Sequence, residues 1–340
     1  MQMKKAFITG INGQDGSYLA EFLLNKGYQV AGLIRRTSTP NLINISNLLK
    51  DIKIYDGDLL DQGSIDRVIK DFKPNEVYNL AAQSFVKSSW NQPILTGDVT
   101  GLGAVRVLES LRNISPETKF YQASSSEMFG NTKDEFISEE SQFFPTSPYA
   151  IAKLYAHNMS INYRNSYKMF CSNGILFNHE SPRRGIEFVT RKITYSLACI
   201  ACNVKTSKMG NEQKEPLVNK GKFKLGNLDA SRDWGFAGDY IEAMWKMLQQ
   251  IKSDDFVIAT GKSYSIRDFL DKGFKYIGKD DWEKYVEIDE RFKRPSELLH
   301  LRGNAEKARN ELEWSPKTNL DKLIKMMIDS DIKLVKLTEK

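Results

Sequence analysis

Tyr149 and Lys153 are the residues whose types and spacing point most directly to chemistry. They stand four positions apart in Tyr149 to Ser166, a run with a helical pattern announced by Pro145 to Pro148. This spacing places both side chains on one helix face, where an ammonium group can lower a phenol pKa and steady a cofactor ribose. A phenolate can then take a hydroxyl proton while hydride leaves the same carbon for nicotinamide. We expect both residues to be catalytic.

The segment before this helix carries serines and an acid. Ala123 ends a predicted strand, and Ser124, Ser125, Ser126 and Glu127 follow it. A serine there can hydrogen-bond both the tyrosine and a reacting hydroxyl. A carboxylate next to it can remove the acidified proton beside a new ketone and help a hydroxyl leave as water. The alternative for Glu127 is a solvated loop acid.

A glycine-rich turn follows the first predicted strand. Gly10, Gly13 and Gly16 form a Gly-x-x-Gly-x-x-Gly pattern that opens a helical run. Glycines allow a tight turn and a close approach of the backbone to a pyrophosphate, which sits at the helix N-terminus. The pattern predicts a dinucleotide site, with a purely structural turn as the alternative.

The second predicted strand ends in basic residues. Arg35 and Arg36, followed by Thr37 and Ser38, stand where an NAD-preferring site carries an acid. Arginine forks suit a 2′-phosphate, so we expect tightly bound NADP, with NAD the less favoured cofactor. Asp58 is a weaker candidate for the adenine contact. Leu80 to Gln83 offer small side chains beneath the cofactor. Ordinary surface arginines are the alternative.

The elements that must position these residues alternate between short apolar runs and longer amphipathic ones, which is typical of βαβ units. The predicted strands are Lys5–Thr9, Gln29–Ile34, Lys53–Asp56, Glu76–Leu80, Lys119–Ala123, Phe170–Leu176 and Asp255–Ala259. The predicted helices are Ser17–Lys26, Gln62–Phe72, Val99–Leu111, Tyr149–Ser166, Ile193–Ala201 and Trp234–Gln250. They predict an α/β fold with a Rossmann-type, doubly wound parallel sheet.

The domain organisation follows from the same pattern. Residues 1–180, with return segments at about 230–262, are expected to form the NADP-binding Rossmann domain. Residues 181–229 and 263–340 are expected to form a smaller C-terminal α/β lobe that binds the substrate. Asn203 to Lys220 is polar and lysine-rich, and it is expected to be an exposed loop or insertion.

Composition excludes several classes of protein. Hydrophobic residues make up 41% and charged residues 27% of the chain, no apolar run reaches the length of a membrane span, and no secretory signal is evident. The formal charge of +6 is spread out, which disfavours nucleic-acid binding. Three cysteines fit a reducing, cytoplasmic setting, and Cys199 and Cys202 are expected to be structural; no metal site is expected.

The chain resembles the extended short-chain dehydrogenase/reductase proteins and, within them, the GDP-mannose 4,6-dehydratase family. The resemblance runs from Ile8 to near Met327. It is most specific at Asn178 to Gly185, Phe188 to Lys192 and Leu225 to Gly235.

The resemblance implies residue roles. The catalytic residues would be Ser125, Glu127, Tyr149 and Lys153. The cofactor would contact Gly10, Asn12, Gly13, Gln14, Asp15, Gly16, Arg35, Arg36, Ser38, Asp58, Leu59, Leu80, Ala81, Ala82, Ser84, Tyr149, Lys153, His179 and Arg184. The GDP-sugar would contact Ser84, Ser125, Glu127, Asn178, Val189, Lys192, Gly226, Arg232, Arg294 and Glu297.

The resemblance also implies a reaction and an assembly. NADP⁺ would oxidise carbon 4 of the hexose, Glu127 would take the carbon 5 proton, water would leave carbon 6, and hydride would return there. Arg35 to Ser38 would approach the cofactor within a homodimer or homotetramer. Such an enzyme would serve surface polysaccharide biosynthesis.

Departures from the family pattern leave alternatives open. Ser125 replaces the usual threonine, and Phe85 replaces the usual histidine in a loop expected to face the sugar. The segment 203–220 is longer than in the family. A GDP-manno-heptose is therefore the alternative substrate. An epimerase or reductase, or an NADP-binding scaffold without catalysis, are the alternative functions.

Overall fold

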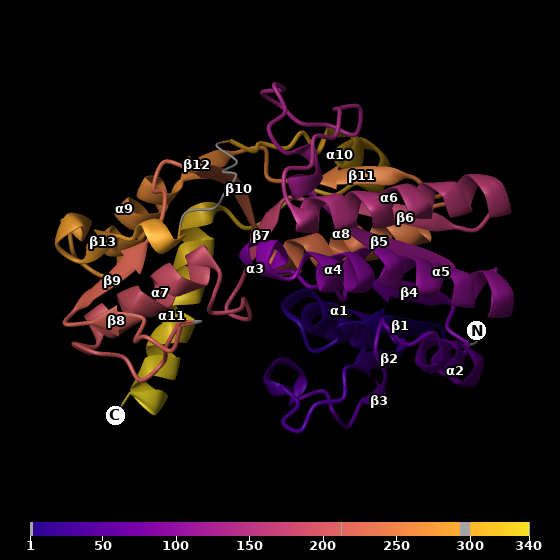
Figure 1. Ribbon diagram of the computed structural model, residues 1–340, viewed down its shortest axis with the longest axis horizontal. Helices are drawn as coiled ribbons and strands as arrows, with labels where there is room; N and C mark the ends of the chain where they lie inside the picture. The colour runs from indigo at the N-terminus through magenta and orange to yellow at the C-terminus, as the bar shows by residue number, and fades with distance from the viewer. Residues whose placement is uncertain (1–2, 212, 293–299, 340) are drawn as a thin grey trace.

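The computed structural model describes residues 3–211, 213–292 and 300–339 (Figure 1). Its larger part contains a seven-stranded parallel sheet in the order β11-β6-β5-β4-β1-β2-β3. The strands are β1 (Lys5–Thr9), β2 (Gln29–Ile34), β3 (Ile52–Asp56), β4 (Glu76–Asn79), β5 (Lys119–Ser125), β6 (Cys171–Leu176) and β11 (Asp255–Ile258). The strand order reverses between β1 and β4, as in a doubly wound sheet, so the predicted fold class is confirmed.

Helices cover both faces of this sheet. One face carries α1 (Gln14–Asn25) and α8 (Ala237–Gln249), and the other carries α2 (Gln62–Phe72), α5 (Gly103–Ile114) and α6 (Pro148–Tyr167) (Figure 1). Successive residues of β1 contribute to two different cores, one on each face of the sheet. Ala6 and Ile8 enter one core and Phe7 enters the other, because side chains alternate along a strand.

The smaller part lies to one side and has its own core (Figure 1). Its helices are α7 (Val189–Ala201), α9 (Ile266–Tyr276) and α11 (Leu320–Thr338), and its strands are β8 (Val218–Asn219), β9 (Lys222–Leu225) and β13 (Val286–Ile288). A third sheet joins the two parts through β7 (Asn178–Glu180), β10 (Ser231–Phe236) and β12 (Ser263–Ser265). The helix α10 (Glu306–Leu312) returns to the larger core.

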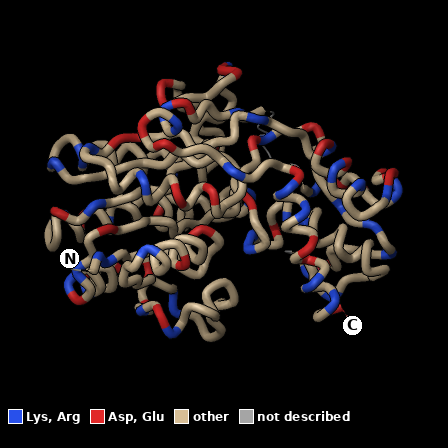
Figure 2. Tube along the Cα trace, turned by 180° about the vertical axis from the view of Figure 1, so that it is seen from behind, with Lys and Arg blue, Asp and Glu red and all other residues tan. Residues whose placement is uncertain are grey.

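Charged residues of both signs are interspersed along the trace of both parts (Figure 2). No helix in the described ranges is long and apolar enough to cross a membrane. Within the same ranges, no group of three or more His, Cys, Asp or Glu side chains is arranged to hold a metal ion.

Two sequence-based expectations need correction. The helix expected from Trp234 begins only at Ala237, because Ser231–Phe236 is strand β10, paired with β7 on one side and β12 on the other. Strand pairing at a buried position outweighs the local helical pattern. The described part of the segment 203–220 is also not exposed throughout, since Leu217 and Val218 are buried in the smaller core.

The helical region after β4 has an irregular start. A short helix, α3 (Val86–Asn91), is followed by α4 (Pro93–Thr96) and by a π-helical turn, η2 (Gly97–Leu102), before α5 continues. The predicted helix Val99–Leu111 therefore spans the end of the π-helical turn and most of α5.

Asp233 ties the joining sheet to the larger part. It is fully buried in β10, and its carboxylate accepts hydrogen bonds from Thr260 N (2.9 Å) and Oγ1 (2.6 Å), from Gly261 N (2.8 Å) and from Gly303 N (3.3 Å). Burial raises its pKa, and the hydrogen bonds oppose that rise.

We predict that Asp233→Asn destabilises the protein by about 2–4 kcal/mol, because an amide NH₂ would face donors that now point at a carboxylate. Urea unfolding followed by circular dichroism measures this. Asp229→Asn is the matched control: Asp229 is an exposed aspartate bonded to Arg267, and its replacement should cost no more than about 0.5 kcal/mol. Equal effects of the two substitutions would contradict the proposed role of Asp233.

Candidate active site

Tyr149 and Lys153 lie in the first turns of α6. The Ser147 side chain caps this helix by accepting a hydrogen bond from Ala150 N (3.1 Å), and Pro148 occupies its first turn. Both side chains face β5 and are buried, with relative exposures of 8% and 5%. The Lys153 ammonium donates to the carbonyl of Ala123 (2.8 Å), so the helix is held against the end of the strand.

Burial dominates the electrostatics of this pair. It raises the pKa of Tyr149 to about 12, against the lowering effects of a hydrogen bond from Ser125 and of the Arg184 charge. It lowers the pKa of Lys153 to about 8. The lowering of the phenol pKa by the ammonium stays a prediction, because burial dominates the net shift of Tyr149. Both groups are desolvated, and the ammonium is directed to Ala123.

Ser125 is the serine that shares the environment of Tyr149. β5 ends at Ser125, and its hydroxyl accepts a hydrogen bond from Glu127 N (3.2 Å) at the start of the single 3-10 turn η3 (Ser126–Phe129). Ser124 instead bonds His157 Nδ1 (2.9 Å), because successive strand residues point to opposite faces. The sequence left three serines as candidates for the serine beside Tyr149. The alternation of side chains along β5 separates Ser125 from Ser124.

Glu127 lies in the same environment. It is 9% exposed, like Ser125, and its charge is among the influences that raise the pKa of Tyr149. A hydroxyl, a phenol and a carboxyl group therefore meet where β5 gives way to η3. Such a set can remove a proton from oxygen and another from carbon.

The glycine turn forms a cradle. Gly10 has φ +71°, and a Cβ there would lie 3.0 Å from Ala81 Cα, while a Cβ at Gly16 would lie 2.3 Å from the Gly10 carbonyl oxygen. Side chains are thus excluded where β1 meets α1. A cavity of about 690 Å³ opens beside this turn. Its volume and its position at the N-terminus of α1 fit a dinucleotide.

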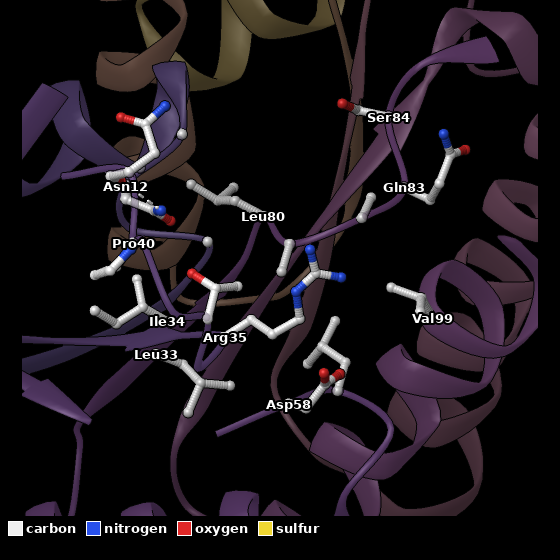
Figure 3. Close-up of a pocket in the computed structure, with 18 of the residues that line it drawn as sticks. Asn12, Leu33, Ile34, Arg35, Pro40, Asp58, Leu80, Gln83, Ser84 and Val99 are labelled. Carbon is white, nitrogen blue, oxygen red and sulfur yellow. Dashed lines mark hydrogen bonds between the residues drawn. The ribbon is translucent and has the colours of Figure 1, made fainter. Parts of the chain in front are cut away.

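Arg35 extends into this cavity from the end of β2, on the side where Asp58 also lies (Figure 3). Asn12 and Pro40 stand across the same space (Figure 3). Asn12 Nδ2 donates to the Asn41 carbonyl (2.9 Å), so the loop after β2 folds back onto the glycine turn.

Most predicted cofactor residues line the cavity, namely Gly10, Asn12, Gly13, Gln14, Asp15, Gly16, Arg35, Asp58, Leu59, Leu80, Ala81, Ala82, Ser84 and Arg184. Arg36, Ser38, Tyr149, Lys153 and His179 are not among the residues that line it. Thr39, Pro40 and Asn41 line it and were missed. The loop that carries them is held in place through the Asn12–Asn41 hydrogen bond, which joins residues far apart in sequence and therefore could not be read from local spacing.

A hydrogen-bonded seam joins α1 to the segment that follows β6. His179 Nε2 pairs with Asp15 Oδ2 (2.7 Å), and its Nδ1 contacts the Phe177 carbonyl (2.7 Å). Both partners accept hydrogen bonds, which favours a doubly protonated ring. Burial lowers the pKa of His179, but the Asp15 carboxylate outweighs it, and the pKa is raised overall. Gln14 completes the seam by accepting from Ser181 Oγ (2.8 Å).

A second cavity lies between the joining sheet and the smaller part. Five predicted substrate residues line it, namely Asn178, Val189, Lys192, Gly226 and Arg232. Ser84 lines the first cavity instead. Ser125 and Glu127 line neither of these two cavities. Arg294 and Glu297 lie outside the described residues. Side chains that sequence analysis did not assign include Lys87, Glu180, Glu187, Phe188, Asn227, Trp234 and Phe292.

Arg184 borders both cavities. The buried Glu180 carboxylate pairs with its guanidinium (3.1 Å) and also accepts from Thr190 Oγ1 (2.5 Å). The guanidinium lies 3.6 Å from the Phe188 ring centre, and Phe85 packs edge-on against the same ring at 5.6 Å. Phe85, which departs from the family pattern, thus forms part of an aromatic wall.

Comparison with known proteins covers nearly the whole chain. The sequence profile described as GDP-mannose 4,6 dehydratase matches residues 7–327. The chain is 49% identical to GDP-mannose 4,6 dehydratase 1 of Arabidopsis thaliana over 98% of this chain and 91% of that protein. It is 43% identical to GDP-mannose 4,6-dehydratase of Vibrio cholerae, with 98% and 94% coverage.

Solved structures share the fold. The dTDP-glucose 4,6-dehydratase of Bacillus anthracis, solved in complex with NAD, superposes with a TM-score of 0.82 at 21% identity, covering 99% of both chains. The dTDP-glucose 4,6-dehydratase of Streptomyces venezuelae gives a TM-score of 0.83 at 18% identity, covering 98% and 99%. The sequence matches, together with the cradle and the residues at the end of β5, place the chain in the GDP-mannose 4,6-dehydratase family of extended short-chain dehydrogenase/reductase proteins.

Proposed function

We propose that this chain is a hydro-lyase that converts GDP-mannose into its 4-keto-6-deoxy derivative with loss of water. The observation that carries the proposal is the position of Glu127, buried next to Ser125 and within electrostatic reach of Tyr149. A redox enzyme of this fold needs a tyrosine, a serine and a lysine. Elimination of water also needs a group that moves a proton at carbon, and Glu127 supplies it.

The residues act in sequence on one hexose. Tyr149 takes the proton of the carbon 4 hydroxyl, and Ser125 orients that hydroxyl by hydrogen bonding. Once carbon 4 is a ketone, the proton on carbon 5 is acidic, and Glu127 removes it. Glu127 then donates a proton to the carbon 6 hydroxyl as it leaves. The dinucleotide, when bound, would supply the acceptor for the carbon 4 hydride and its return to carbon 6, so no cofactor is consumed. Carbon 5 regains a proton as the hydride returns, which balances the proton that Tyr149 took from the carbon 4 hydroxyl.

The cofactor proposed is NADP, held tightly. Arg35 reaches into the cavity from the end of β2, where NAD enzymes of this type carry an acid. Thr37 and Thr39 add hydroxyls to the same wall. A guanidinium and two hydroxyls suit a 2′-phosphate better than a 2′-hydroxyl.

The second cavity is proposed to bind the GDP moiety, with Lys192 and Arg232 meeting the diphosphate. Arg294 and Glu297 are proposed substrate residues on resemblance alone. GDP-manno-heptose remains the second candidate, because Phe85, which departs from the family pattern, packs against Phe188 in the wall of this cavity. Incubating the enzyme separately with each GDP-sugar, with mass spectrometry of the products, distinguishes the two.

We also propose a homodimer or homotetramer. Large apolar side chains are exposed on neighbouring helical segments. They are Ile94 (86%) and Leu95 (38%) on α4, Leu102 (44%) on η2, and Ile151 (56%) and Tyr155 (43%) on α6. Exposed apolar side chains gathered in this way are typical of a surface that another protein covers.

Glu127→Gln tests the elimination step. The amide is isosteric and cannot take the carbon 5 proton, so we expect the rate of water elimination to fall at least about a hundredfold. NADP affinity should be unchanged. The assay incubates GDP-mannose in deuterated water and follows deuterium at carbon 5 and the loss of water by mass spectrometry. Elimination at the normal rate by this variant would overturn the role of Glu127, whereas a wild-type protein that releases no water from GDP-mannose would overturn the dehydratase assignment and favour an epimerase or reductase.

Arg35→Ala tests the cofactor proposal. Losing one guanidinium partner of a phosphate should weaken NADP about tenfold to a hundredfold and leave NAD affinity nearly unchanged. Fluorescence titration of the two reduced dinucleotides measures both constants. Arg36→Ala is the control, since Arg36 is not among the residues lining the cavity. An equal loss for NAD and NADP would contradict recognition of a 2′-phosphate by Arg35.

Lys153→Met tests the burial of the lysine through the pH dependence of stability. The folded pKa is about 8 against 10.5 for a free lysine, so the unfolded chain binds more protons between these values. Wild-type stability should therefore rise with pH from about 8 to 10.5, relative to Lys153→Met, by on the order of 3 kcal/mol. Chemical unfolding across this pH range measures it. Parallel curves for both proteins would show that Lys153 is solvated.

A further inference from the structure

The described residues of the segment 203–220, which exclude residue 212, form a hairpin. Its arms pair through Asn211 N to Glu215 O (2.8 Å) and Leu217 N to Met209 O (3.0 Å). The buried Leu217 anchors one arm in the smaller core, and Glu339 at the end of α11 accepts from Met209 N (3.2 Å). The segment is therefore able to hold another element in place.

Two residues near the tip of this hairpin bind the Arg291 side chain. The guanidinium donates to Gln213 Oε1 (2.9 Å) and makes a two-pronged contact with Glu215, at 3.2 and 3.1 Å. On its other side it bonds the Asp289 carboxylate (2.8 Å). The backbone N–H of Asp289 in turn donates to Leu225 O (2.8 Å) on β9. Arg291 thus joins the hairpin to the end of β13.

The residue after Arg291 is part of the second cavity. The Phe292 ring lies 3.8 Å from the Lys192 ammonium, and the Lys87 ammonium approaches the same ring at 5.2 Å. The Phe292 backbone is pressed against Gly226, where a Cβ would lie 2.9 Å from the Phe292 carbonyl oxygen. The position of Phe292 therefore shapes the cavity next to Lys192.

We propose that the hairpin 203–220 is a brace: Gln213 and Glu215 hold Arg291, and Arg291 holds Phe292 against Lys192 and Gly226. The ligand class is a guanosine diphosphate, whose anionic groups meet Lys192. The inference rests on the proposed function, because it requires the second cavity to bind GDP. Gln213 and Glu215 are positioning residues, since they bond Arg291 and are not among the residues that line the second cavity.

The size of the effect is bounded by the contact itself. Arg291 and Glu215 are about half exposed, at 45% and 43%, and pairs of this kind contribute little to stability. Loss of these contacts can lower the affinity for the ligand only to the extent that it moves Phe292 away from its position in the cavity. We therefore expect about a threefold to tenfold effect on affinity and little change in melting temperature.

The experiment titrates GDP into the NADP-loaded protein by calorimetry. We expect Glu215→Gln to raise the dissociation constant of GDP about threefold to tenfold, and Glu215→Gln with Gln213→Ala to raise it further. The KM for GDP-mannose should rise in parallel, while kcat and NADP affinity stay unchanged. In a double-mutant cycle, Glu215→Gln should add nothing once Arg291→Gln is present, because its partner is gone.

Glu287→Gln is the matched control. It neutralises a glutamate of similar exposure (47%), paired with Lys222 in the same sheet, and should leave GDP affinity within about twofold. Lys192→Met tests the site itself. If Lys192→Met weakens GDP binding and the Glu215 variants do not, the brace is refuted, whereas the proposed GDP site is supported. If all variants bind GDP as the wild type does, the proposed site fails as well. If Glu215→Gln also weakens NADP binding and lowers the melting temperature, the substitution disturbs the whole protein, and the brace is refuted.

Discussion

The seam between α1 and the segment after β6 is the contact on which both cavities depend. The glycine cradle ends in Gln14 and Asp15, and these two side chains bond His179 and Ser181. Three residues after Ser181 comes Arg184, and the rest of the second cavity follows. The loop that would hold a pyrophosphate and the segment that would hold the sugar nucleotide are thus aligned by the same few hydrogen bonds. A doubly protonated His179 balances the Asp15 charge beside the cradle, where an unpaired carboxylate would repel an anionic ligand.

Burial is the second constraint, and it acts on every proposed catalytic group. Tyr149, Lys153, Ser125 and Glu127 are all at most 9% exposed. Desolvation favours the neutral forms of the phenol and of the lysine, as their shifted pKa values indicate. Charge that develops during proton transfer is therefore strongly influenced by nearby groups, because little water screens it. Ser125 and Arg184, which lower the phenol pKa, therefore have a stronger effect on it than they would have in water.

Much of the fold could be predicted because its signals are local. β1, β2 and α2 match their predicted bounds, since periodicity and glycine turns define them. Trp234 was misassigned because its partner, Asn178, lies far away in sequence. The same limit applies to the sites. The cradle is one continuous motif and was predicted from spacing, whereas Phe292 reaches the second cavity only through contacts with Lys192 and Gly226.

Arg184 has a consequence for inhibitor design. Its guanidinium borders both cavities, and Glu180 and Phe188 fix its orientation from the side. A molecule long enough to occupy both cavities would pass this one cation midway along its length. In such a bisubstrate compound, an acidic group placed at the centre would pair with Arg184 and link the two arms across one cation.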